Sequence, residues 1–380
     1  MQRRLGWSII SRSIATVSAL PRQNLQQVQQ TLAQSQVRSW LDLCTGHEGD
    51  LGVDEDCIVP LQRAQEAGSI SLYRVPIDPL WLEAETARQV AATMSAVEKP
   101  VLVSSRSSTR AQAALLLHEA SSRGWGADKA LDRASELGFG KVLEDRGLVE
   151  WIIAGITSLT KSPGQVIFRQ LFERESCTYT YIVGCATSRE AVVIDPVDTM
   201  FARDRQMLEE LCLEPKYAVD THLHEDHMSA AGRFSQEFSG CASAAGVASG
   251  IDAELQLEER QHLEFGANFM EARATPGHTP GCVSLVMDDR SAVFTGDSLL
   301  IRGCGQPSSQ VGSSTQLFQS VREQLMVLPK DTLVYPAHNF SGLTCSSVGE
   351  EANYNPLLGF MSSQEEFEAA MGKKQQTSQA

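Results

Sequence analysis

The amino-acid sequence of 380 residues lacks several features that would assign it to a class of protein at once. No apolar run approaches the roughly 18 residues of a membrane-spanning helix, so no such helix is expected. The nine cysteines are scattered and form no Cys-x-x-Cys pair, which argues against a zinc ribbon and against a disulfide framework. The formal net charge is −15 and no local basic stripe offsets it, which argues against nucleic acid as a partner.

Acidic residues are also missing from the first part of the chain. The first of the 47 acidic residues is Asp42, whereas the opening segment MQRRLGWSIISRSIATVSAL carries Arg3, Arg4, Arg12 and four serines. A segment rich in Arg and Ser but without acidic residues is typical of an organelle transit peptide. We therefore expect residues 1–19 to direct the protein to the mitochondrion, with the plastid as the alternative. A basic N-terminal tail on a cytosolic enzyme is the other interpretation.

The length of the chain predicts two or more domains. Strand and helix patterns alternate over residues 20–156, which predicts a small α/β domain. Residues 157–164, TSLTKSPG, are polar and end in Pro-Gly, as expected for a linker. Residues 165–371 are rich in strand patterns and predict a second domain, and residues 372–380 are expected to form a frayed tail.

The segment THLHEDH, residues 221–227, holds three of the eight histidines in the chain. Neutral imidazoles and carboxylates are common ligands of zinc and of non-haem iron. A polar turn with chance histidines would explain so dense a cluster poorly. The segment therefore predicts a metal site, but by itself it leaves open whether one ion or two are bound.

Three further segments carry residues of the same kinds, each directly after a strand pattern. They are TPGHT with His278, TGD with Asp297 and PAH with His338. Loops that follow the strands of a rigid sheet often carry catalytic groups. Together with the histidine cluster, and in this order, they resemble the metallo-β-lactamase superfamily over about residues 165–370. The resemblance implies an αββα sandwich, in which two sheets pack face to face with helices outside and the metal at one edge.

Within that superfamily, the segments EAVVIDPVD, ATPGHTPGCVSLV and TGDSLLIRGCG resemble the persulfide dioxygenases. The resemblance implies one Fe²⁺ per chain, held by His222, His278 and Asp297. Two histidines and one carboxylate form a facial triad, which leaves open positions on iron for O₂ and substrate. Four further residues would then orient the ligands and tune the metal, or would be remnants of a dinuclear ancestor: His224, Asp226, His227 and His338.

The activity implied by this resemblance is the oxidation of glutathione persulfide, or of a related low-molecular-weight persulfide, by O₂ to sulfite and thiol in sulfide detoxification. Homodimers are common in the resembled family. One alternative is a dinuclear thioester hydrolase of the glyoxalase II type, although only 42 residues follow His338, too few for the helical C-terminal domain of those enzymes. A non-catalytic protein that binds an anion or a persulfide is the second alternative, and the intact ligand set argues against it.

The chain departs from the persulfide dioxygenases near two of these segments. That family usually continues Arg-Gly-Cys-Gly with Arg-Thr-Asp-Phe, and later reads Ala-His-Asp-Tyr. Here Arg302 is retained, but Gln306, Asn339 and Phe340 replace an arginine, an aspartate and a tyrosine. We expect these four residues to contact the substrate. Because charged hydrogen-bonding groups are lost, glutathione persulfide should be held more weakly, or another persulfide should be preferred.

The first predicted domain contains Ser-Arg-Ser-Ser-Thr-Arg, residues 105–110, between a strand pattern and a helix pattern. Such a loop can bind an anion at the helix N-terminus. The domain resembles small dual-specificity-phosphatase-like or rhodanese-like domains, with Ser105 in place of the nucleophilic cysteine, followed by Arg106 and Arg110. A serine hydroxyl without a neighbouring base does not ionise as a thiolate does. We therefore predict an anion-binding or purely structural domain, and a loop that only caps the helix remains an alternative.

Overall fold

The computed structural model of the chain describes residues 7–11, 14–18, 37–43, 70–78, 80–105, 107–160, 166–308 and 312–378. The chain divides into two compact units, Met1–Thr160 and Lys161–Ala380. Each unit has its own buried core. No helix in the described residues is long and apolar enough to cross a membrane.

The first unit is built on a five-stranded sheet in the order β1-β2-β5-β3-β4. Strands β2, β5, β3 and β4 are parallel to one another, and β1 is antiparallel to β2 at the edge. The strands are β1 (Trp7–Ser11), β2 (Ile14–Ser18), β3 (Ser39–Asp42), β4 (Ser71–Arg74) and β5 (Val101–Ser105). The helices are α3 (Ala84–Ala96), α4 (Ser108–Arg123), α5 (Ala127–Glu136), α6 (Gly140–Glu144) and α7 (Arg146–Thr160).

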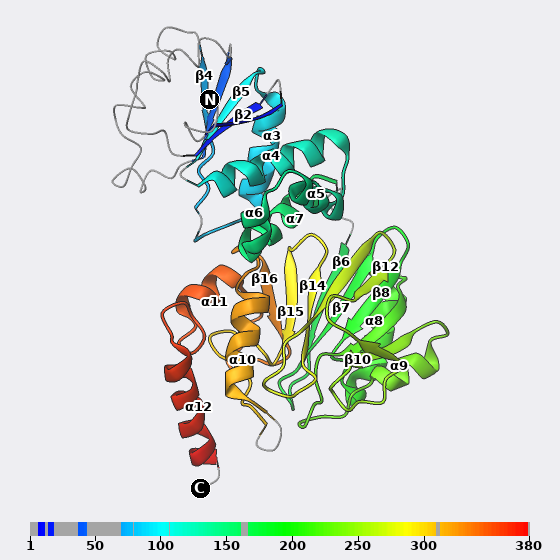
Figure 1. Cartoon of the computed structure of the whole chain (residues 1–380). Helices are drawn as coiled ribbons and strands as arrows, with labels where there is room; N and C mark the ends of the chain where they lie inside the picture. The colour runs from blue at the N-terminus through cyan, green and yellow to red at the C-terminus, as the bar shows by residue number, and fades with distance from the viewer. Residues whose placement is uncertain are drawn as a thin grey trace. The chain divides into compact units, whose positions relative to one another are not determined.

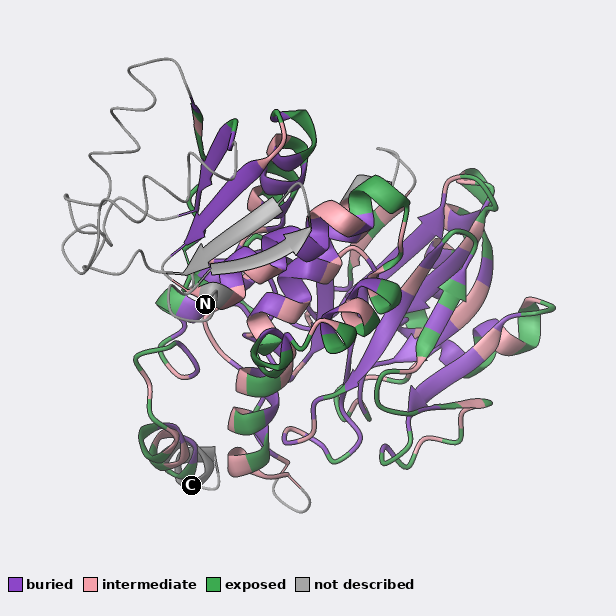
Figure 2. Ribbon diagram, turned by 45° about the horizontal axis from the view of Figure 1, so that its top comes forward, coloured by how far each residue is buried: buried purple, intermediate pink, exposed green. Residues whose placement is uncertain are grey.

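Apolar side chains from β3, β5 and the helices form the core of the first unit. Figure 2 colours the buried residues of these elements purple. All five residues of β5, VLVSS, are buried, as is usual for a parallel strand that is covered on both faces. Trp151 of α7 is fully buried, and its indole Nε1 donates to the carbonyl of Glu83, which precedes α3, at 2.8 Å. The alternating strands and helices that the sequence predicts for this part of the chain are therefore present.

Several predicted boundaries lie inside regular elements. Strands β1 and β2 fall within residues 1–19, the predicted leader, and the backbone of β2 pairs with β5. Helix α7 continues to Thr160, so residues 157–160 of the predicted linker are helical, and residues 161–165 lie outside the described residues. Helix α12 continues to Ser378, so most of the predicted frayed tail is helical as well. Its polar residues Gly372–Ser378 extend a helix that begins on a packed apolar face.

The second unit contains two six-stranded sheets, in the orders β11-β10-β9-β8-β7-β6 and β12-β13-β14-β15-β16-β17. The first sheet consists of β6 (Val166–Phe172), β7 (Tyr179–Cys185), β8 (Glu190–Ile194), β9 (Glu214–Asp220), β10 (Ala242–Gly246) and β11 (Leu255–Leu257). The second consists of β12 (His262–Phe265), β13 (Asn268–Ala274), β14 (Val283–Met287), β15 (Ala292–Gly296), β16 (Leu333–Pro336) and β17 (Ser346–Ser347). The helices are η3 (Asp198–Met200), α8 (Phe201–Glu210), α9 (Ala231–Glu237), α10 (Ser314–Ser320), the π-helix η4 (Val321–Leu325), α11 (Val348–Tyr354) and α12 (Gln364–Ser378).

Alternate residues of the same strands face two different cores. Val192 and Ile194 of β8 pack between the two sheets, against residues such as Phe294 of β15. Their neighbours Ala191 and Val193 pack with residues of α8 and α9 on the outer face. Residues on the outer face of the second sheet pack in the same way with residues of α10, η4, α11 and α12. Helices thus cover the outer face of each sheet (Figure 1), and the expected αββα sandwich is confirmed.

A buried carboxylate, Glu271 of β13, holds three arginines in the second sheet. Its Oε1 accepts from Arg273 Nε at 2.8 Å and from Arg260 Nη1 at 2.5 Å, and its Oε2 accepts from Arg290 Nη2 at 2.8 Å. Burial would raise the pKa of Glu271, but the charges of Arg290 and Arg273, and then of Arg260, lower this pKa to about 2. The stabilising charge is therefore present above about pH 4.5 and is lost as the pH falls toward about 2.

We expect Glu271→Gln to lower the free energy of unfolding by about 3 kcal/mol at neutral pH, because buried arginines lose a charged partner. The difference from the unmodified protein should shrink as the pH falls from about 4.5 to about 2. Urea unfolding of both proteins at a series of pH values measures this difference in the free energy of unfolding. The control is Glu264→Gln, because Glu264 is exposed, and this substitution should change the free energy of unfolding by no more than about 0.5 kcal/mol. A Glu271→Gln effect as small as that of the control would contradict the prediction.

Candidate metal centre

Four loops bring the predicted ligand residues to one edge of the sandwich. Residues 221–227 follow β9, His278 follows β13, Asp297 follows β15 and His338 follows β16. The two sheets are tied together at this edge by backbone hydrogen bonds, from Val283 N to the Thr221 carbonyl at 2.8 Å and from Tyr179 N to the Ala337 carbonyl at 2.7 Å. The loops are therefore anchored on both sheets.

Gly296 permits the close approach of two of these loops. Its φ is +53°, and a Cβ atom added there would lie 2.5 Å from Thr221 Oγ1. Any other residue would be strained in this conformation and would push the Thr221 loop away. The glycine of TGD is thus needed to hold Asp297 beside His222.

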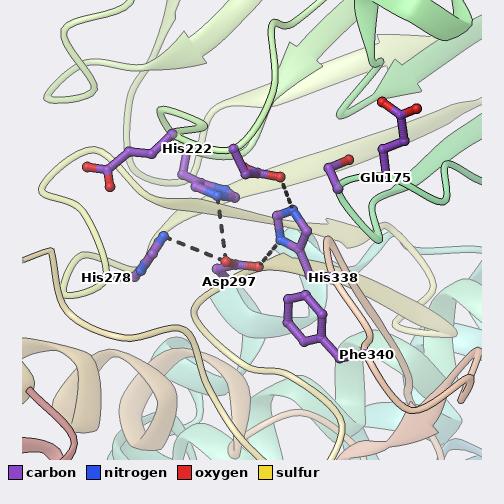
Figure 3. Close-up of a pocket in the computed structure, with 9 residues that line it drawn as sticks. Glu175, His222, His278, Asp297, His338 and Phe340 are labelled. Atoms are coloured by element: carbon purple, nitrogen blue, oxygen red, sulfur yellow. Dashed lines mark hydrogen bonds and ion pairs between the residues drawn. The ribbon is translucent and has the colours of Figure 1, made fainter. Parts of the chain in front are cut away.

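The carboxylate of Asp297 lies at the middle of the site, between three histidines (Figure 3). Its Oδ2 is 3.9 Å from His222 Nε2 and 3.7 Å from His278 Nε2, and its Oδ1 is 2.7 Å from His338 Nδ1. His222, Asp297 and His338 offer possible ligand atoms that all lie within 4.8 Å of one another, and His278 joins this group through Asp297. The structure therefore brings the three predicted ligands together.

The hydrogen-bond partners of His278 and His222 fix which nitrogen of each ring carries the proton. His278 Nδ1 lies 2.5 Å from the carbonyl of Gln306, which can only accept, so Nδ1 donates. His222 Nδ1 lies 2.9 Å from Thr221 Oγ1, whose own proton goes to Asp195 Oδ2 at 3.0 Å. Burial, and then the charge of His224, lowers the pKa of His222 to about 3, so this ring is neutral.

Both Nε2 atoms consequently present lone pairs toward the carboxylate oxygen Oδ2 of Asp297. Three acceptors that face one another repel unless a cation lies between them. Two neutral imidazoles and one carboxylate are also ligands that suit a divalent transition-metal ion. The residues present therefore fit a metal ion at this position.

His338 is placed between two carboxylates. Its Nδ1 contacts Asp297 Oδ1 at 2.7 Å and its Nε2 contacts Asp226 Oδ2 at 3.0 Å. Burial would lower the pKa of His338, but the hydrogen bonds to Asp226 and Asp297 raise this pKa to about 10. Burial likewise opposes ionisation of Asp297, yet the hydrogen bond from His338 lowers its pKa. His338 therefore donates from both nitrogens and holds Asp297 with Oδ2 toward the other two histidines.

The other three predicted residues lie next to this centre. His224 Nε2 contacts Asp195 Oδ1 at 3.2 Å, and Asp226 Oδ2 also contacts His227 Nδ1 at 3.0 Å. His224 Nδ1 and His227 Nε2 are buried and have no hydrogen-bond partner among the described residues. With Asp226 and His338 they form a second group that can hold a metal ion. The arrangement thus leaves room for the dinuclear alternative.

A cavity of about 490 Å³ opens onto the centre (Figure 3). It is lined by Glu175, Ser176, His222, Glu225, Asp226, His278, Asp297, His338 and Phe340. Sequence reasoning did not select Glu175, Ser176 or Glu225. Glu225 lies within the histidine cluster, and its position between two ligand-type residues was a usable signal. Glu175 and Ser176 lie in the connection between β6 and β7, and no local pattern marked them.

Of the four predicted substrate contacts, Phe340 alone is among the residues that line this cavity. Arg302 forms ion pairs with Glu350 and Glu351. Gln306 contributes its backbone carbonyl to His278, and its side chain is exposed. The buried side chain of Asn339 accepts from the backbone N–H groups of Ser341 and Leu343, each at 2.9 Å, and so stabilises the local turn. In this structure, therefore, Arg302, Asn339 and the backbone of Gln306 bind other groups of the protein, and none of the three residues lines the cavity.

The predicted anion loop of the first unit is described only in part, because Arg106 lies outside the described residues. Ser105 is buried and its hydroxyl donates to the carbonyl of Ser107. Ser107 is the N-cap of α4, and its side chain accepts from Thr109 N. Arg110 is also buried and donates to the carbonyl of Ile77 at 2.7 Å. These contacts account for Ser105 and Arg110 as structural residues, and the anion-binding role stays a prediction.

Comparisons with known proteins agree with this geometry. The family described as the metallo-β-lactamase superfamily matches residues 174–338. The chain is 47% identical over 223 residues to the mitochondrial persulfide dioxygenase ETHE1 of Bos taurus, which covers 58% of this chain and 87% of that protein. For the protein of the same name from Homo sapiens the identity is 47% over 211 residues, covering 56% and 82%. The crystal structure of ETHE1 from Myxococcus xanthus is similar with a TM-score of 0.53 and 39% identity, covering 55% of this chain and 91% of that one.

The hydrogen bonds that link Asp195, Thr221 and His222 provide a test of the metal centre. We expect Thr221→Val to weaken metal binding about 10- to 100-fold. Valine cannot accept the hydrogen bond from His222 Nδ1, so the ring is no longer held in the tautomer that leaves Nε2 free. Competition with a chelator measures the affinity. Thr332→Val is a matched control, since Thr332 is also buried and donates to the carbonyl of Arg290, away from the centre. Equal affinities for the two variants would refute the proposed role of Thr221.

Proposed function

Since the chain belongs to the persulfide dioxygenase family of the metallo-β-lactamase superfamily, we propose that it oxidises a low-molecular-weight persulfide with O₂, with glutathione persulfide as the reference substrate. The persulfide, O₂ and water give the thiol, sulfite and two protons, and O₂ accepts the four electrons that the sulfur loses. The observation that carries this proposal is the convergence of His222 Nε2, His278 Nε2 and Asp297 Oδ2 beneath a cavity that is open to a small molecule.

We propose one Fe²⁺ per chain as the cofactor, held by His222, His278 and Asp297. When bound, this ion supplies open coordination positions for O₂ and for the persulfide sulfur. The position of His338 supports a single ion, because both of its ring nitrogens already have hydrogen-bond partners within the protein, Asp297 and Asp226. Asp226, which accepts from His227 and His338, is likewise used within the protein.

The surrounding residues prepare the centre for this reaction. Thr221 and the carbonyl of Gln306 keep the protons of the two ligand histidines on Nδ1. His338 keeps a proton on Nδ1 and thereby orients Asp297. Such partners of ligand side chains set the orientation and the donor strength of the ligands. The cavity walls, which include Phe340, then receive the organic part of the substrate.

We expect protein that is purified without oxygen to contain close to one iron per chain, as measured by elemental analysis. His222→Ala, His278→Ala and Asp297→Ala should each lose the iron and the persulfide-dependent oxygen uptake, because a facial triad has no spare ligand. His262→Ala is the control, since His262 is an exposed histidine of β12 outside the centre. Two zinc ions per chain together with thioester hydrolysis would instead favour the dinuclear hydrolase alternative. Iron binding without oxygen uptake would favour the binding-protein alternative.

We further propose that the protein acts in the mitochondrion. The relatives are named as mitochondrial proteins, and the first 41 residues of this chain contain no acidic residue. For the first predicted domain, residues 20–156, we propose an anion-binding or structural role without phosphatase or sulfurtransferase activity, because Ser105 occupies the position of the nucleophile in the resembled domains.

A fusion of residues 1–40 to a fluorescent protein should leave the cytosol and accumulate in mitochondria, as seen by microscopy. Replacement of Arg3, Arg4 and Arg12 by alanine should reduce this accumulation, because the positive charges of such leaders drive import. A diffuse cytosolic signal from the unmodified fusion would show that the segment is an ordinary basic tail.

A further inference from the structure

The walls of the cavity carry more negative than positive charge. Of the nine residues that line it, Glu175, Glu225, Asp226 and Asp297 are acidic, and none is a lysine or an arginine. Asp226 and Asp297 are paired with histidines at the floor of the site. Glu175 and Glu225 are exposed and, within the part of the chain that the structure describes, form no ion pair. Two carboxylates on the cavity wall are therefore available to a bound molecule.

The turn that carries Glu175 is held in place by a buried carboxylate. Glu173 accepts from the backbone N–H groups of Glu175 and Ser176, each at 2.7 Å, and from Ser176 Oγ at 2.6 Å. Glu173 is only 4% exposed. Figure 3 shows Glu175 and Phe340 near His338, on the side of Asp297 away from His278. Because the backbone of this turn is fixed before a ligand arrives, less conformational entropy is lost when Glu175 contacts it.

Glu225, which also lines the cavity, is fixed by its position in the chain. It lies between His224, which is bound to Asp195, and Asp226, which is bound to His227 and His338. The cation nearest in sequence to the Asp297 loop, Arg302, is occupied by Glu350 and Glu351 and does not line the cavity. Its charge is therefore not directed to a substrate carboxylate. Phe340 adds an apolar surface that stacks against His338, with the ring planes 2° apart.

The charge of these walls bears on which persulfide fits the site. We propose that Glu175 and Glu225 determine specificity by selecting persulfides whose organic tail carries an ammonium group, over persulfides whose tail carries a carboxylate. This inference rests on the proposed function. The sulfur end reaches the floor of the cavity, and the ammonium group lies at the walls that carry the two glutamates. Glutathione persulfide, which has one ammonium group and two carboxylates, is accordingly an intermediate substrate rather than the best one.

Two persulfides of equal tail length test this directly. Cysteamine persulfide carries an ammonium group, and the persulfide of 3-mercaptopropionate carries a carboxylate at the corresponding position. Initial rates of oxygen uptake by the iron-loaded full chain give kcat/KM for each. We expect the kcat/KM for cysteamine persulfide, divided by the kcat/KM for the persulfide of 3-mercaptopropionate, to exceed one. Glu175→Gln and Glu225→Gln should each lower this ratio about two- to fivefold, the range of a single exposed charge pair, and the double variant should lower it further.

Two controls separate this effect from others. Glu264→Gln removes an equal charge from β12, outside the cavity, and should leave the ratio unchanged. Raising the ionic strength should compress the ratio for the unmodified protein toward one, because it screens exposed charges, and should change the double variant little. A ratio at or below one for the unmodified protein, or a ratio that Glu264→Gln lowers as much as the cavity variants do, overturns the inference.

A second measurement does not depend on turnover. Calorimetric titration with the thiols cysteamine and 3-mercaptopropionate compares binding of the same two tails to the iron-loaded protein under argon. Cysteamine should bind more tightly, and the preference should fall in the double variant. If no persulfide supports oxygen uptake, the proposed function fails, but this binding ratio still decides on the role of the two glutamates. If uptake is observed and neither ratio responds to the variants, only the inference fails.

Discussion

The metal centre depends on one carboxylate whose two oxygens meet partners of opposite kinds. Asp297 Oδ1 accepts a hydrogen bond from His338, while Asp297 Oδ2 faces the lone pairs of His222 and His278. The first contact is satisfied within the protein and keeps the carboxylate from rotating. The second is unfavourable without a cation. The protein thus holds two acceptors and an anion together in advance, and the binding of a positive ion relieves their repulsion.

This arrangement needs a scaffold that resists the repulsion, and the two sheets provide it. The sheets share an apolar core between them, and at the site edge they are joined by backbone hydrogen bonds from Val283 to Thr221 and from Tyr179 to Ala337. Asp297 and His338 follow β15 and β16, which are parallel neighbours, so the two side chains start from adjacent strand ends. Ligands from both sheets are therefore held at fixed separations.

The sequence predicts the ligands better than their surroundings, for a physical reason. His222, His278 and Asp297 are proposed to act through their side chains, which stand in recognisable motifs, so the family resemblance implied both these ligands and the sandwich around them. Gln306 acts on His278 through its backbone carbonyl, which every residue has, and so no residue type reveals this contact. The engagement of Arg302 with Glu350 and Glu351 was also hidden, because the partners lie 48 and 49 residues away in the chain. Exposed glutamates such as Glu175 follow no pattern that separates a cavity wall from ordinary surface.

Helix α12 belongs to the core more than its polar composition suggests. Phe367 and Met371 are each 1% exposed and pack in the cluster that lies under α10 and η4, and Glu368 accepts from Thr315 of α10 at 2.6 Å. A chain shortened before residue 364 would therefore lose part of the outer layer of the second sheet, with the effect of several large-to-small core substitutions. A purification handle should therefore not replace this helix.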